Sequence, residues 1–178
     1  GWGTIGKYPT FANGFIRKAV ADVQPTREGF VLVYLTPSIE SEVLASISAV
    51  NQRFKVYGKT SCRILPDHIE CLDISPQFAE DLTKCSYVIA PGGNQLLGEC
   101  RYFKKPILVI PEPGQWEQHV NAHYAQKLGI AQRCHRHELS SSVVKEFFKH
   151  FDDDVQNWPT YENGASKYII DAIKERRL

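Results

Sequence analysis

The sequence predicts an α/β protein in which one parallel sheet of about six strands carries helices on both faces. Between Phe30 and Phe151, short segments of strand length alternate with segments whose apolar residues recur at helical spacing. The first short segment, Phe30–Leu35 (FVLVYL), is apolar throughout, which is typical of a strand buried on both faces of a parallel sheet. Right-handed crossovers between such strands give a doubly wound, Rossmann-like sheet.

Six segments are predicted as strands, with helical segments between and after them. The predicted strands are Phe30–Leu35, Phe54–Gly58, Ile69–Ile74, Tyr87–Pro91, Pro106–Pro111 and Ile130–Cys134. The predicted helices are Ser38–Val50, Pro76–Cys85, Asn94–Phe103, Trp116–Gly129, Glu138–Phe151 and Gly164–Arg177. Pro76 suits the first turn of its helix, and Gly129 suits a helix end. Residues 1–29 are expected to be irregular, apart from a short helical tendency at 15–20.

One domain accounts for most of the 178 residues, since domains commonly run to about 100–200 residues. Residues 30–178 are predicted to form this domain with its closing C-terminal helices, and residues 1–29 to form an interdomain arm or linker. The chain begins GWGTIG and contains no Met. We therefore expect a piece of a longer protein, with cloning-derived residues at its start.

Composition narrows the range of partners and environments. The 21 basic and 20 acidic residues give a net charge of +1, which provides no electrostatic basis for binding nucleic acid. No apolar run approaches the roughly 20 residues that a membrane-spanning helix needs. The five cysteines form no CxxC pair, which favours reduced thiols in a cytoplasmic protein over a disulfide framework.

A glycine pair stands between a predicted strand and a predicted helix in the segment APGGNQLLGE. In doubly wound sheets ligands bind at the carboxyl ends of the strands, where the N-terminus of the next helix also lies. Free N–H groups near Asn94 favour an anion such as phosphate, and the glycines allow it to approach closely. Glu99 could accept hydrogen bonds from a ribose diol. Alternatively, Gly92-Gly93 is only a tight turn and Glu99 a solvated residue.

A second polar cluster follows the next predicted strand. Glu117 and Gln118 are adjacent at a helix start, and Asn121 lies one helical turn further on. Beside a phosphate site, these side chains could hold the hydroxyl groups of a sugar. The alternative is a helix start enriched in Glu because of the helix dipole. Two such clusters at neighbouring strand ends are less expected by chance than one.

Together these two motifs, GG-x5-E followed by P-x5-EQ-x2-NA, resemble the carboxy-terminal donor-binding half of GT-B glycosyltransferases. The resemblance covers Phe30 to Phe151. It is closest to the family 28-like branch that contains the lipid II N-acetylglucosaminyltransferases and the galactolipid synthases. The fold it implies is one half of a GT-B fold, in agreement with the alternation of strands and helices.

The resemblance implies a binding role for each matching residue. In this family the first Glu binds ribose, the amides after the glycines bind diphosphate, and the acidic-Gln pair binds the donor sugar. The nucleotide and diphosphate residues implied are Ile74, Ser75, Phe78, Gly92, Gly93, Asn94, Gln95 and Glu99. The donor-sugar residues implied are Glu117, Gln118 and Asn121.

Two features depart from the family pattern. Leu96 stands where many members have a Thr that contacts phosphate. The loop after the first strand, LTPSIE, is not rich in glycine, and Thr36 and Ser38 are its polar candidates for contacting the donor.

The function that the resemblance implies is transfer of a hexose or N-acetylhexosamine from a UDP-sugar to an acceptor hydroxyl, with inversion. The helix start near Asn94 would stabilise the departing diphosphate, so no cofactor and no metal is implied. The catalytic base would come from an amino-terminal domain, and no catalytic residue is assigned here. The acceptor is unassigned, although acceptors in this branch are often lipids. The location implied is cytoplasmic, peripheral at the inner face of a membrane through the other half.

Two alternatives remain beside a transferase half. The chain could be a non-catalytic subunit that binds a nucleotide sugar for a partner protein. It could also be a nucleotide-sugar epimerase, although the EQHVNA form of the second motif argues against that.

Other candidate groups are weaker. His119 and His123 have a metal-ligand spacing, but HVNAH lacks the Glu of HExxH, and a helix surface facing another domain explains them as well. Lys104 and Lys105 follow a predicted helix, where the helix dipole stabilises cations.

Overall fold

A computed structural model describes residues 2–5, 8–11, 16–17, 20–58, 65–151 and 158 of the chain. Its body is a six-stranded sheet in which all neighbouring strands run parallel. The strands are β3 (Phe30–Tyr34), β4 (Arg53–Tyr57), β5 (Ile69–Leu72), β6 (Tyr87–Ala90), β7 (Ile107–Val109) and β8 (Ala131–Arg133). The predicted fold class is therefore confirmed.

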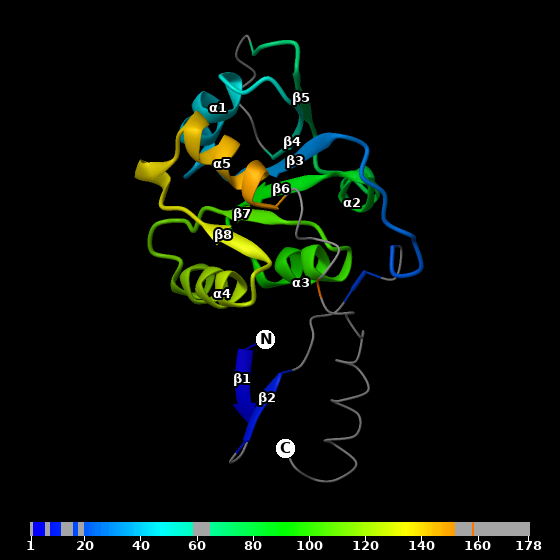
Figure 1. Ribbon diagram of the computed structural model, residues 1–178, viewed down its shortest axis with the longest axis vertical. Helices are drawn as coiled ribbons and strands as arrows, with labels where there is room; N and C mark the ends of the chain where they lie inside the picture. The colour runs from blue at the N-terminus through cyan, green and yellow to red at the C-terminus, as the bar shows by residue number, and fades with distance from the viewer. Residues whose placement is uncertain are drawn as a thin grey trace.

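Helices cover both faces of this sheet (Figure 1). The helices of the described residues are α1 (Glu40–Ser48), α2 (Gln77–Lys84), α3 (Asn94–Tyr102), α4 (Trp116–Lys127) and α5 (Ser141–Phe151). Helices α1 and α5 contact each other on one face, and α3 contacts α4 on the other, where α2 also lies. None of these helices is long and apolar enough to cross a membrane.

The strand order β5-β4-β3-β6-β7-β8 reverses direction between β3 and β6. From these two central strands the chain builds outward to opposite edges of the sheet. The connections that leave their carboxyl ends go to opposite faces, so a crevice opens there between the loops. Both strands are almost fully buried, as their continuous apolar sequences predict.

Element ends differ from the sequence prediction by only a few residues. The exception is the first 29 residues, where the prediction of irregular structure was wrong in part. Strands β1 (Trp2–Ile5) and β2 (Tyr8–Phe11) form an antiparallel pair there. A short 3-10 helix, η1 (Arg136–Glu138), was also not predicted. The predicted helix Gly164–Arg177 lies outside the described residues.

Gly92 forms the turn that leads from β6 into α3. Its φ of +100° is a conformation that residues with a side chain rarely adopt. A Cβ atom added there would lie 2.5 Å from Cγ1 of Val109 on β7. Glycine therefore lets the turn lie directly against β7. Gly93 has an ordinary φ of −61° and open space around its Cα.

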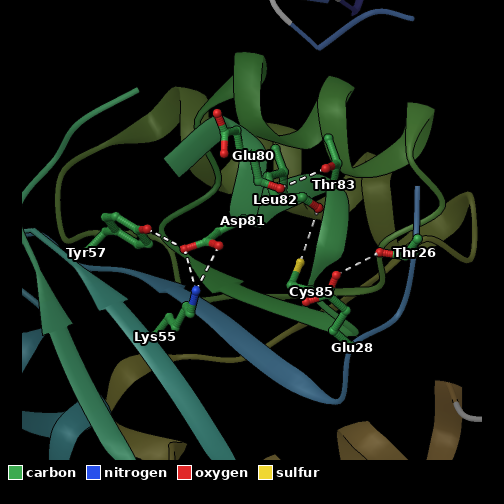
Figure 2. Close-up of polar contacts among 9 residues, drawn as sticks. All are labelled: Thr26, Glu28, Lys55, Tyr57, Glu80, Asp81, Leu82, Thr83 and Cys85. Atoms are coloured by element: carbon green, nitrogen blue, oxygen red, sulfur yellow. Dashed lines mark hydrogen bonds and ion pairs between the residues drawn. The ribbon is translucent and has the colours of Figure 1, made fainter. Parts of the chain in front are cut away.

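A buried carboxylate connects α2 to the sheet (Figure 2). Asp81 on α2 is 3% exposed and accepts hydrogen bonds from Lys55 at 2.9 and 3.0 Å and from the Tyr57 hydroxyl at 2.5 Å. Burial and this hydrogen bond raise the pKa of Tyr57, so its hydroxyl stays protonated and donates. The contact fixes Phe78 one turn earlier on α2, where its ring lies edge-on against Tyr57 with 5.1 Å between centroids.

The segment before β3 is attached to the sheet by a buried lysine. Lys105 is 1% exposed and donates to the backbone carbonyls of Thr26 and, at 2.7 Å, of Cys85. Burial lowers the pKa of Lys105. Earlier in this segment, the carbonyl of Ala21 accepts a hydrogen bond of 2.5 Å from the hydroxyl of Tyr102. The sequence indicated that Lys105 is a cation stabilised by a helix dipole. In the structure it instead connects the segment before β3 to the sheet.

Four cysteines lie within the described residues, and all four are free thiols. Cys85, Cys100 and Cys134 are buried, and Cys71 is half-buried. Burial raises the pKa of Cys85 to about 12 and that of Cys134 to about 11, so both stay protonated at neutral pH. Cys62 lies outside the described residues.

Replacing Asp81 by Ala should destabilise the protein by about 3–5 kcal/mol, because the Lys55 ammonium loses its partner inside the protein. Urea unfolding measures this change. Glu80→Ala is the matched control, since Glu80 is exposed on the same helix and should change stability by no more than about 0.5 kcal/mol. Equal effects of the two substitutions would show that Asp81 does not fasten α2.

Replacing Gly92 by Ala should lower the free energy of unfolding by about 1–3 kcal/mol, because its Cβ would overlap Val109. Gly93→Ala, one position on, should be nearly neutral because nothing lies within 4 Å of its added Cβ. Urea denaturation of both variants tests the difference. A Gly92→Ala variant as stable as the Gly93→Ala variant would contradict the close packing of the turn on β7.

Candidate functional site

A cavity of about 500 Å³ opens at the carboxyl ends of the central strands, where the crevice is expected. It collects residues from the ends of β3, β5, β6 and β7 and from the first turns of α2, α3 and α4. Eight of the predicted site residues line it: Thr36, Ile74, Phe78, Gly93, Asn94, Gln95, Glu99 and Gln118. The predicted residues that do not line it are Ser38, Ser75, Gly92, Glu117 and Asn121.

Helix α3 begins at the wall of this cavity. Gly93 is the residue before its first turn, and no side chain caps the helix start. No acidic residue occupies the first turn. The N–H groups at a helix start have no partner within the helix, and with the positive end of the helix dipole they make this wall favourable for an anion. Gly92 brings the helix start close to β7, and the open surroundings of Gly93 leave room for a ligand.

Glu99 enters the cavity wall from α3 and is fully buried. Its carboxylate is held by Arg17 through two bonds of 2.6 Å, from Nε to Oε1 and from Nη2 to Oε2. Gln95 donates to Oε1 at 3.1 Å. The guanidinium of Arg17 also lies over the ring of Phe78, 5.4 Å from its centroid. Arg17 therefore binds the same carboxylate oxygens that the family resemblance assigns to a ribose.

Arg17 was not predicted as a site residue. A buried carboxylate requires a cation or several donors, so the sequence could have indicated that Glu99 needs a partner. It could not indicate which one, because Arg17 is 82 positions away in the chain. Its side chain is 39% exposed, so one side of the ion pair faces solvent.

Glu112 is a second carboxylate in the cavity that the sequence analysis missed. It follows β7 in the segment PEPG, which has the composition of a turn. Its Oε1 accepts a hydrogen bond from Gln118 Nε2 at 2.9 Å, and its backbone N–H donates to Gln118 Oε1 at 2.9 Å. Ser38 donates to Oε2, and Thr36 Oγ1 lies 3.2 Å from Ser38 Oγ.

These contacts keep Glu112 charged. Burial raises the pKa of Glu112, but hydrogen bonds from Ser38, Gln118 and Thr36 outweigh burial and hold the pKa below its usual value. Ser38 thus lies behind the cavity wall and supports Glu112. Glu112 thus contributes a negative charge to the cavity at neutral pH from the β7–α4 loop.

The other polar residues of the second motif, Glu117 and Asn121, do not line the cavity. Asn121 is 4% exposed, and its amide donates to the carbonyl of Gly92 at 3.3 Å and to Glu117 Oε1 at 3.5 Å. It therefore connects α4 to the glycine turn. Glu117 is exposed on the first turn of α4. Ser75 is also exposed, next to Ile74, which is 63% exposed at the cavity rim.

A second cavity, of about 610 Å³, lies beside α4 and β8. His119 and His123 both line it, together with Trp116, which is 79% exposed. Arg133 Nη2 lies 3.2 Å from His119 Nδ1. Within the part of the chain that the structure describes, no group of three or more His, Cys, Asp or Glu residues is arranged to hold a metal ion.

The known proteins that this chain resembles are described as glycosyltransferases. A curated protein of Bacillus subtilis (strain 168), described as "Uncharacterized UDP-glucosyltransferase YojK", is 29% identical over 123 residues, which is 62% of this chain and 29% of that protein. The chain thus spans less than a third of the length of that relative.

Solved structures share the fold. The glycosyltransferase of kitacinnamycin matches with a TM-score of 0.62 at 19% identity, over 95% of this chain and 49% of that chain. SnogD from Streptomyces nogalater matches with a TM-score of 0.53 at 19% identity, over 93% of this chain and 48% of that chain. VinC, solved in complex with dTDP, matches with a TM-score of 0.56 at 14% identity, over 91% of this chain and 45% of that chain. The chain corresponds to about half of each of these GT-B glycosyltransferases.

The family described as Glycosyl transferase family 1 matches residues 6–152, most of the chain and all of the strands that border the crevice. The fold, the motif pair and this match agree, and the protein belongs to the glycosyl transferase family 1.

Proposed function

We propose that this chain is the donor-binding half of a glycosyltransferase whose donor is a nucleoside diphosphate sugar. The observation that carries the proposal is the cavity at the strand reversal, which the first turn of α3 and the carboxylate of Glu99 both line. An anion site beside a carboxylate suits a diphosphate attached to a ribose. The name of the Bacillus relative supports a UDP-sugar, and the VinC complex supports a pyrimidine nucleotide more generally.

In this proposal each wall of the cavity takes one part of the donor. The amides of Gly93, Asn94 and Gln95 hold the diphosphate, and Glu99 accepts hydrogen bonds from the ribose hydroxyls. The base lies near Phe78 and the exposed Ile74 and Ser75, and the sugar extends toward Gln118, whereas Glu117, one residue earlier, does not line the cavity. Gly93, Asn94, Gln95, Glu99 and Gln118 lie in the two motifs and line the cavity. Ile74, Ser75 and Phe78 come from the family resemblance, and of these three Ile74 and Phe78 line the cavity.

The proposed reaction is a single displacement with inversion. The acceptor oxygen forms a bond to the anomeric carbon while the bond from that carbon to the diphosphate oxygen breaks. The start of α3 stabilises the negative charge that the departing nucleoside diphosphate gains. The acceptor proton passes to a base in another domain, so the chain alone is inactive in this proposal.

Several finer statements belong to the same proposal. Residues 1–29 connect the sheet to an amino-terminal domain or contact a partner subunit, and the protein works in the cytoplasm, peripherally at a membrane. The family 28-like branch, a hexose or N-acetylhexosamine donor, and a lipid acceptor stay predictions. A non-catalytic donor-binding subunit would use the same cavity, and turnover by the full-length protein would distinguish it from an enzyme.

Arg17 sets a condition on this proposal. Glu99 is fully buried beneath its ion pair with Arg17, so a ribose cannot reach the carboxylate while that pair is intact. Nucleotide binding therefore requires Arg17 to leave Glu99, and the ribose and the arginine compete for the same oxygens.

Calorimetric titration of the chain should give saturable binding of UDP or dTDP and weaker binding of GDP. Glu99→Gln should weaken UDP binding by about 1–3 kcal/mol, because a hydrogen bond to a charged group is lost. Glu146→Gln, an exposed carboxylate on α5, is the control and should leave binding unchanged. Unaltered UDP affinity in a folded Glu99→Gln variant would remove Glu99 from the site.

Arg17→Ala should strengthen UDP binding several-fold, because the competitor for Glu99 is gone. Saturating UDP should also speed trypsin cleavage after Arg17 in the unmodified chain. Arg53→Ala is the control, since Arg53 lies over Phe30 at the opposite end of the sheet. Weaker UDP binding by the Arg17→Ala variant, with slower cleavage, would mean that Arg17 contacts the nucleotide.

A further inference from the structure

We propose that Glu112 is a residue through which the cavity recognises the donor sugar, by accepting a hydrogen bond from a sugar hydroxyl. This inference rests on the proposed function. The motif pair assigns the sugar to Glu117 and Gln118 and gives Glu112 no role. The contacts of Glu112 give it one.

The position of Glu112 fits a sugar better than any other part of the donor. It enters the cavity from the β7–α4 loop, whereas Glu99 and the anion-favouring amides come from α3. With the base near Phe78, the ribose at Glu99 and the diphosphate on the start of α3, the sugar is the remaining part of the donor. Repulsion between carboxylate and diphosphate disfavours Glu112 as a phosphate contact, but it does not oppose a neutral sugar.

The hydrogen bonds of Glu112 leave it able to accept more. Gln118 donates to Oε1 and Ser38 donates to Oε2. Thr36 is a third donor to the carboxylate. A carboxylate can accept about four hydrogen bonds, so Glu112 retains capacity for about one more. The same contacts hold the carboxylate in one orientation and keep it ionised. Hydroxyl donors bind such a carboxylate more strongly than a neutral acceptor.

Gln118 acts through Glu112 in this arrangement. Its amide oxygen accepts from the Glu112 backbone, and its amide nitrogen donates to the Glu112 carboxylate, so the two residues form a closed pair. We therefore assign Gln118 a positioning role. Glu117 is exposed and does not line the cavity, and its Oε1 lies 3.5 Å from the Asn121 amide.

The test compares Glu112→Gln with Glu117→Gln, which makes the same change of charge and shape five residues later, on the first turn of α4. The affinity of each variant is measured by calorimetry for UDP and for UDP-glucose, UDP-galactose and UDP-N-acetylglucosamine. The ratio of UDP-sugar affinity to UDP affinity isolates the contribution of the sugar. The unmodified chain should bind at least one UDP-sugar more tightly than UDP.

Glu112→Gln should reduce that ratio by about ten-fold or more, the loss expected for hydrogen bonds to a charged group. UDP itself should bind as well as before or better, since a negative charge near the diphosphate is removed. Glu117→Gln should keep the ratio. If Glu112→Gln lowers the melting temperature strongly, Glu112→Asp replaces it, because it keeps the charge and withdraws the carboxylate by one methylene.

Three results would overturn the inference. The first is a Glu112→Gln variant with an unchanged ratio, and the second is a ratio lost in Glu117→Gln alone. The third is an unmodified chain that binds UDP but gains nothing from any sugar, which leaves the nucleotide site intact. A chain that binds neither UDP nor dTDP overturns the proposed function as well, so the two failures are distinguishable.

Discussion

The burial of β3 on both faces is the constraint from which the site follows. A strand with Val31, Leu32 and Val33 fully buried must have helices on both faces and strands on both edges, and here β4 and β6 supply the edges. Because the chain builds outward from this centre in both directions, the loops at the carboxyl ends separate there and nowhere else in the sheet. The cavity, the start of α3 and the acidic side chains all lie at that separation.

Buried charges determine how the surrounding elements attach to this sheet. Asp81 holds α2 through Lys55, Lys105 holds the segment before β3 through backbone carbonyls, and Glu99 holds the segment around Arg17. Removing one partner of such a contact leaves a charge inside the protein without compensation, which is costly. The three contacts therefore fix the positions of α2 and of the segment before β3, which includes Arg17, relative to α3. Both elements contribute to the cavity, α2 through Phe78 and the segment before β3 through Arg17.

The parts of this molecule that the sequence predicts well are those governed by local pattern. Apolar segments predicted all six strands of the sheet, and the glycine pair predicted the turn at Gly92 and the start of α3. Residues that depend on distant partners were missed. Arg17 lies in a segment with only a short helical tendency, Glu112 lies in a turn-like PEPG, and the neighbourhood of Lys105 resembles an ordinary helix end. Each of these side chains has its role only because of a contact that the fold creates. The antiparallel pair β1 and β2 was missed because its strands, WGTI and YPTF, contain Gly and Pro and lack the continuous apolar pattern of the central strands.

The contact between Arg17 and Glu99 has a consequence for exchanging halves between related transferases. A junction placed at residue 29, where the sheet begins, would leave Arg17 on one parent and Glu99 on the other. The buried carboxylate would then meet a foreign segment, and the chimera would inherit a cavity with one wall from each parent. A junction placed before Ile16 keeps the pair together, so the functional boundary of this domain lies upstream of its first central strand.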